Sequence, residues 1–129
     1  MTTADEIADL ARNLGGPTAN EVRIRCGISR AYYAAFHYCE MAANNFCEQL
    51  PESDKKDRGN HSQLYVRLEN HSKSRANELN LKKMAAEAQN LKNLRVDADY
   101  HLNKILDLKL HGRSLHYMNQ VKYYLNELK

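Results

Sequence analysis

The longest helical pattern in the chain is centred on the run Leu94-Arg95-Val96-Asp97-Ala98-Asp99-Tyr100-His101. Around it, apolar or small residues recur at intervals that bring side chains to one face of a helix; they are Met84, Ala88, Leu91, Ala98, Leu102 and Ile105. The one gap in this seam, at position 95, holds arginine. A guanidinium stays charged and is costly to bury alone, so Arg95 requires an anion, either a carboxylate of the protein or a phosphate of a ligand.

Helix geometry decides which charged groups of this run can meet. Arg95 and Asp99 are four residues apart and can form an ion pair on one face, and Asp97 and His101 can pair in the same way. Arg95 and His101 are about 120° apart around the helix and roughly 9 Å apart along it, so they can flank one groove without touching. A histidine for proton transfer and a cation for phosphate charge are sufficient for phosphodiester cleavage. The alternative is that Arg95 and Asp99 form a structural pair.

A second cluster, Tyr32-Tyr33-Ala34-Ala35-Phe36-His37, is rich in aromatic residues. Packing explains such a cluster, because aromatic rings bury large areas and their polar tips find local partners. In the functional alternative, Tyr33 and His37, one helical turn apart, face the same cleft as Arg95.

Composition predicts an all-α fold in a single domain over residues 1–129. The chain has only two prolines and five glycines, and no strand pattern of period two occurs. Helices are expected over residues 3–13, 20–47, 61–70, 78–110 and 113–128, with a polar loop over 49–60. We predict an antiparallel bundle of four or five helices. On the second of these helices, the expected core stripe is Val22, Cys26, Ser29, Tyr33, Phe36, Ala43 and Phe46.

Charge is unevenly distributed along the chain. Residues 1–58 hold 7 basic and 9 acidic side chains, whereas residues 59–129 hold 12 basic and 7 acidic. A basic second half is compatible with a phosphate-bearing partner, and Lys92 and Lys104 are placed to contact phosphates. A solvated helix surface explains the same charges.

Metal, cofactor and membrane signals are weak or missing. The three cysteines form no CxxC pair and no two histidines are four residues apart, so neither a metal site nor a cofactor is expected. No apolar run approaches the roughly 20 residues needed to span a bilayer. The first residues have no basic or apolar leader features, so we expect a cytoplasmic protein.

Three motifs in order carry a family resemblance. They are Ser29-Arg30-Ala31-Tyr32-Tyr33-Ala34-Ala35-Phe36-His37, then Gly59-Asn60-His61-Ser62, then Arg95-Val96-Asp97-Ala98-Asp99-Tyr100. Together they resemble the HEPN superfamily, in particular its small stand-alone prokaryotic members, over roughly residues 20–125.

The resemblance implies a HEPN-type helical bundle that forms a homodimer. It implies a metal-independent endoribonuclease of a toxin–antitoxin or phage-defence system, whose signature is arginine, four to six residues, then histidine. Arg95 and His101 fit that spacing. Both protomers would contribute the pair to one cleft, where attack of the RNA 2′-hydroxyl leaves a 2′,3′-cyclic phosphate. His101 would move the proton and Arg95 would stabilise the phosphate, with Asp97, Asp99 and Tyr100 in support.

A second reading of the resemblance is a non-catalytic HEPN protein that binds a nucleotide or a nucleotidyltransferase partner. Nuclease members often carry a polar residue after the arginine, where this chain has Val96, and the Arg-x-x-Ala-Asp-Tyr branch is defined by Asp99 and Tyr100. Under either reading, the expected partners are RNA, a second copy of the chain, and a nucleotidyltransferase antitoxin or another defence-system protein.

Overall fold

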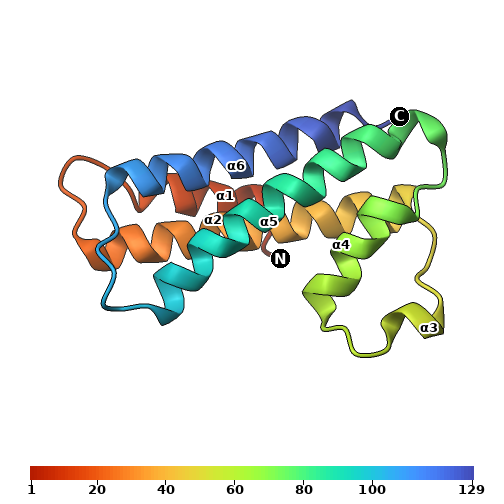
Figure 1. Cartoon of the computed structure of the whole chain (residues 1–129). Helices are drawn as coiled ribbons and strands as arrows, with labels where there is room; N and C mark the ends of the chain where they lie inside the picture. Colours follow the sequence, from red (N-terminus) through yellow and green to blue (C-terminus); the bar gives the residue numbers. More distant parts are fainter.

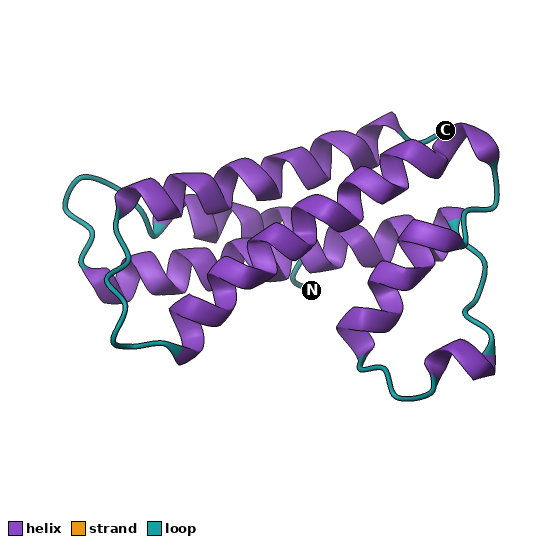
Figure 2. Cartoon of the chain, in the orientation of Figure 1, coloured by secondary structure: helices purple, strands orange, loops and turns teal.

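The computed structural model describes all 129 residues, and its regular structure is helical. Five helices and two single turns follow one another along the chain (Figures 1 and 2). They are α1 (Ala4–Asn13), α2 (Glu21–Phe46), the short α3 (Glu52–Lys55), α4 (Asn60–Asn70), a 3₁₀ turn (Arg75–Asn77), α5 (Glu78–Tyr100) and α6 (Leu108–Glu127).

Four of these helices form the bundle, and the fifth crosses it at one end. The helices α1, α2, α5 and α6 lie side by side, and each is antiparallel to the one before it in the chain (Figure 1). Helix α4 packs against both α2 and α5, and His61 at its start stacks on Tyr32 and Phe36 of α2. Helix α2 contacts all four of the others. The predicted all-α antiparallel bundle of four or five helices is confirmed.

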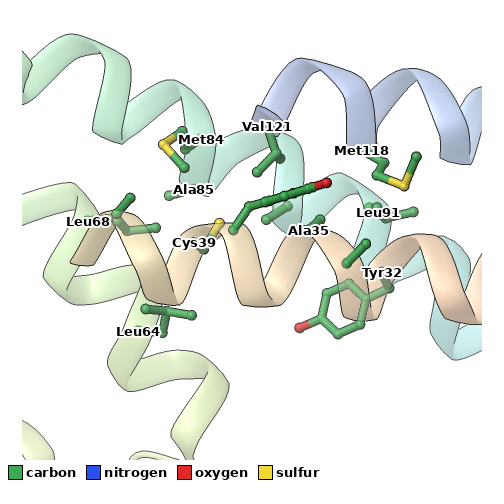
Figure 3. Close-up of a cluster of buried hydrophobic side chains, with 14 of the residues drawn as sticks. Tyr32, Ala35, Cys39, Leu64, Leu68, Met84, Ala85, Leu91, Met118 and Val121 are labelled. Atoms are coloured by element: carbon green, nitrogen blue, oxygen red, sulfur yellow. The ribbon is translucent and has the colours of Figure 1, made fainter. Parts of the chain in front are cut away.

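The core lies between α2, α5 and α6, with α4 closing one end (Figure 3). Small residues of α2 let the other helices approach its backbone closely, and larger side chains from α4, α5 and α6 fill the space between them. The largest fully buried side chains include Tyr32, Leu68, Leu81, Met84, Leu91, Met118 and Val121.

Local sequence signals account for the helix starts. Thr3 caps α1 in a reciprocal capping box with Glu6, and Asn20 caps α2 by accepting from the backbone N–H of Arg23. Asp107 caps α6 in the same way, from the N–H of Leu110.

A buried histidine ties the start of α6 to the turn between α1 and α2. His111 donates from Nε2 to the carbonyl of Ala11 at 2.8 Å. Its ring fills the space next to Gly15 and Gly27, where a Cβ atom would lie 2.2 Å and 2.7 Å from ring atoms. The two glycines are therefore needed for the close approach of the imidazole.

The expected helix over 78–110 is wrong at its C-terminal end. Helix α5 stops at Tyr100, and α6 starts at Leu108 and runs through Gly112, across the expected break between residues 110 and 113. Leu102 and Ile105, expected on the buried seam, lie in the intervening loop and are 76% and 86% exposed.

The core stripe expected on α2 is only partly correct. Ser29 and Ala43 are buried, but Val22 and Cys26 are exposed. The buried face turns instead through Ile24, Ile28, Ala31, Tyr32, Ala35, Tyr38, Cys39 and Ala42. The reason is tertiary: α2 is surrounded by four helices, so its buried surface is much wider than one stripe.

The cysteines form no disulfide, and Cys39 and Cys47 are buried. None of the helices combines the length and the apolar character that a membrane span requires.

Candidate functional site

Arg95 lies in the seam between α2 and α5 with its side chain only 13% exposed. Its Nε atom is 3.1 Å from Oδ2 of Asp99, which also accepts a hydrogen bond from the Ser29 hydroxyl at 3.3 Å. Nε itself is fully covered and makes no hydrogen bond, so its N–H is not directed at that carboxylate. The contact between Arg95 and Asp99 is an ion pair rather than a charged hydrogen bond.

Three tyrosine rings enclose the guanidinium of Arg95. Its central carbon lies 5.4 Å, 5.7 Å and 5.5 Å from the ring centres of Tyr32, Tyr33 and Tyr100, which is the range of cation–π attraction. The ring of Tyr32 is fully buried, whereas Tyr100 is 66% exposed. One wall of this tyrosine cage is therefore at the molecular surface.

Most hydrogen-bonding capacity of Arg95 is unused. A guanidinium has five N–H donors, and here a single long bond of 3.4 Å joins Nη2 to the Tyr33 hydroxyl. Aromatic faces attract the cation but accept no directed hydrogen bonds comparable to those of an oxyanion. The tyrosine cage therefore holds the planar guanidinium of Arg95 in place and leaves several of its N–H donors for an anionic ligand.

His101 lies at the C-terminal end of the same helix, with its side chain 46% exposed. Its Nδ1 is 2.7 Å from Oδ1 of Asp97, and Nζ of Lys104 lies 3.0 Å from that same oxygen. The bonds from His101 and then Lys104 lower the pKa of the Asp97 carboxyl below its ordinary value. The carboxylate thus orients the imidazole and leaves Nε2 directed away from the protein's own acceptors.

A guanidinium from α2 fixes the position of His101. Arg25 donates from Nη1 to the carbonyls of Asp97 and Ala98 at 3.0 Å, and it also bonds the carbonyls of His101 and Lys104. Arg25 thus bonds carbonyls of the last turn of α5 and of the loop that follows it, and it acts as a C-terminal cap supplied by another helix. Sequence reasoning missed Arg25, because no local signal links position 25 to position 100.

Within one chain, the structure does not bring Arg95 and His101 together. Arg95 contacts the tyrosine cage and Asp99, whereas His101 contacts Asp97 and Lys104, and the two share no partner.

Of the two aromatic-cluster residues expected near Arg95, only Tyr33 contacts it. His37 pairs with Glu40 through Nδ1 at 2.8 Å, and it borders a shallow hollow next to the start of α1. The structure therefore places His37 outside the site around Arg95.

A further histidine, absent from the expected site residues, lies close to Arg95. Nδ1 of His61 hydrogen-bonds the hydroxyl of Tyr32, which is also bonded to the Tyr65 hydroxyl at 2.6 Å. Burial lowers the pKa of His61, and the positive charges of Lys92 and Arg95 lower it further. His61 is thus neutral near pH 7 and is linked to Arg95 through the ring of Tyr32. Its position in the Gly59-Asn60-His61-Ser62 motif was the only sequence signal.

No group of three or more histidine, cysteine or acidic side chains in the structure could hold a metal ion. Comparisons with protein-family models, curated proteins and solved structures find no match for this chain. Its function must be argued from the site itself.

Proposed function

We propose that the chain is a HEPN-type, metal-independent endoribonuclease that acts as a homodimer. The observation that carries the proposal is Arg95, a largely covered arginine held between tyrosine rings with most of its donors free. A buried cation without a full set of protein acceptors favours a ligand that supplies oxyanions. An RNA phosphate has that chemistry, and the exposed ring of Tyr100 offers a face on which a base can stack.

The second component is the pair formed by His101 and Asp97. With Nδ1 held by the carboxylate, Nε2 of His101 is the atom that exchanges a proton with substrate. Two copies of the chain supply two such histidines, one to accept the proton of the 2′-hydroxyl and one to donate a proton to the leaving 5′-oxygen. A bond forms between the 2′-oxygen and phosphorus, and the bond to the 5′-oxygen breaks. The products are a 2′,3′-cyclic phosphate and a 5′-hydroxyl, and Arg95 balances the charge that develops on the phosphate.

Exposed apolar side chains next to His101 support the homodimer. Leu102 and Ile105 project into solvent from the loop that follows His101, and Leu108 at the start of α6 is also exposed. Contact between two such loops would bury them and bring the two histidines near one another.

One observation favours a second function, in which the chain binds without cleaving. Arg95 and His101 have no common contact, and Arg95 is paired with Asp99 inside its own protomer. On this reading, the tyrosine cage binds the phosphate of a nucleotide or an acidic segment of a nucleotidyltransferase partner, and His101 has no catalytic role.

Cleavage of labelled single-stranded RNA in excess chelator separates the two functions. We expect the wild type to cleave, and Arg95→Ala and His101→Ala each to lose nearly all activity while keeping the wild-type helical circular dichroism and dimer mass. Products that end in a 2′,3′-cyclic phosphate would support the proposed chemistry. If the folded, dimeric wild type leaves RNA intact, or if all three proteins cleave equally, the nuclease proposal fails. Unfolding of Arg95→Ala would instead show that the ion pair with Asp99 is structural.

A further inference from the structure

A groove of about 470 Å³ runs between α4 and α5, beside the site of Arg95. Its volume is in the ordinary range of ligand sites in proteins. Arg58 and Ser62 line one wall near the start of α4, and Lys92 and Asn93 line the other wall, on α5. Figure 1 shows the reason for the opening: α4 diverges from α5 toward its own N-terminus.

The two cations of this groove have no protein partners. Neither Arg58 nor Lys92 takes part in any ion pair of the structure. The carboxylate of the groove, Glu69, lies at the opposite end and accepts a hydrogen bond from Gln89 at 2.9 Å. The groove therefore has a positive end, and the N-terminal dipole of α4 lies at that same end.

The positive end of the groove adjoins the tyrosine cage. Lys92 and Arg95 are three residues apart on α5, a rise of about 4.5 Å along the helix. Val96, the residue after Arg95, is itself part of the groove wall, as is Tyr65, whose hydroxyl bonds to Tyr32 of the cage. The groove wall and the tyrosine cage thus share α5 and are linked through the hydroxyls of Tyr65 and Tyr32.

We propose that this groove binds the sugar–phosphate backbone of single-stranded RNA next to the phosphate held by Arg95. The inference rests on the proposed function and extends it, because it assigns the substrate path as well as the reacting phosphate. Arg58 and Lys92 bind phosphates from opposite walls, and Ser62 and Asn93 offer hydrogen bonds to phosphate or sugar oxygens. Proteins that bind single-stranded nucleic acid without strong sequence preference commonly combine a positively charged groove with exposed aromatic rings.

Binding of an uncleavable strand tests the groove separately from catalysis. The probe is a fluorescent single-stranded 2′-O-methyl oligonucleotide, titrated with protein at several salt concentrations. The double variant Arg58→Gln/Lys92→Gln removes two groove charges. Its matched control, Lys109→Gln/Arg113→Gln, removes two exposed charges from α6, which does not border the groove. Both variants have the same net charge.

We expect the groove variant to bind more weakly, with the slope of log K against log salt reduced by about 1.4, since each phosphate contact on a single strand contributes about 0.7. The control should keep the wild-type slope. An unchanged slope in the groove variant, an equal loss in both variants, or no binding by the wild type would overturn the proposal. Groove-dependent binding by a wild type that cleaves no RNA would reject the nuclease function and retain the groove. If the wild type cleaves RNA but its binding does not depend on the groove, the nuclease function would be retained and the groove rejected.

Discussion

At the scale of single residues, an arginine inside an apolar seam requires surroundings that replace the water it has lost. Around Arg95 this replacement is incomplete: three tyrosine rings and one carboxylate balance its charge, but Nε is buried without a hydrogen bond, and the guanidinium makes one long hydrogen bond, to Tyr33. Structural arginines in the same chain are treated differently. Arg67 donates to backbone carbonyls, and Arg25 donates to backbone carbonyls and to the carboxylate of Glu21. This contrast is the strongest argument that Arg95 serves a ligand.

The tyrosine that links Arg95 to His61 gives a residue-scale prediction at alkaline pH. Burial raises the pKa of Tyr32 to about 12, although Tyr65 and Arg95 act in the opposite direction, and burial also raises the pKa of Tyr65. These two tyrosines therefore lose their protons at a higher pH in the folded chain than in the unfolded chain. The stabilisation is complete below about pH 10 and is lost as the pH rises toward 12, by about 1.4 kcal/mol per pH unit for each tyrosine.

Urea unfolding at a series of pH values between neutral and strongly alkaline measures this loss, with tyrosinate absorbance followed in parallel. Tyr32→Phe should reduce the dependence on pH. A free energy of unfolding that stays constant through the ionisation of Tyr32 would contradict the prediction.

At the scale of the elements, two glycines within helices are expected to respond to alanine in opposite directions. At Gly27 of α2, a Cβ atom would lie 2.7 Å from the buried ring of His111, whose Nε2 is bonded to Ala11. Overpacking should cost Gly27→Ala about 1–3 kcal/mol despite the better helix propensity of alanine. At Gly112 of α6 nothing lies within 4 Å, so Gly112→Ala should stabilise by up to about 1 kcal/mol. Urea unfolding followed by circular dichroism compares the two; equal effects would refute the packing role assigned to Gly27.

The end of α5 gives a second prediction at this scale. Because Arg25 bonds several carbonyls at this helix end, Arg25→Ala should lower the free energy of unfolding by about 2–4 kcal/mol. Amide exchange should increase over residues 98–106 in particular. Arg23→Ala is the control, since Arg23 makes one exposed backbone bond, to Asn13, and should cost less than about 1 kcal/mol. Unchanged exchange in Arg25→Ala would show that the helix ends for another reason.

These elements also show what the sequence could predict. Starts of helices depend on contacts within four residues, and the starts expected at residues 3 and 20 agree with the caps Thr3 and Asn20 for that reason. The end of α5 depends on Arg25, which is 72 residues away from the first carbonyl it binds, so the periodic pattern was extended wrongly through Ile105.

The same distinction holds within the candidate site. The pairs of Arg95 with Asp99 and of Asp97 with His101 follow from helical spacing and are present. His61 joins the site only through its tertiary contact with Tyr32, and no spacing in the sequence could have placed it there.

At the scale of the whole molecule, two charged regions meet around α5. The groove with Arg58 and Lys92 adjoins the tyrosine cage, and His101 lies at the end of the same helix, where the α5–α6 loop exposes Leu102 and Ile105. A single chain leaves these apolar side chains in water and gives Arg95 and His101 no common contact. A homodimer formed through this loop would bury Leu102 and Ile105 and could bring Arg95 of one protomer close to His101 of its partner. Its active site would then be composite.

A composite site predicts that two inactive variants restore one another. Arg95→Ala and His101→Ala, each inactive alone, are mixed and allowed to exchange subunits, and RNA cleavage in chelator is measured. A mixed dimer retains one Arg95 and one of the two histidines, on different protomers, so it keeps the charge stabilisation and one of the two proton transfers. Activity should therefore return only to a small but measurable fraction of the wild-type value, because water must perform the other proton transfer. Adding Leu102→Ser and Ile105→Ser to both partners should disperse the dimer and abolish the restoration. If native mass spectrometry detects mixed dimers but no activity returns, one Arg95 and one His101 on different protomers do not suffice, and this composite arrangement is wrong.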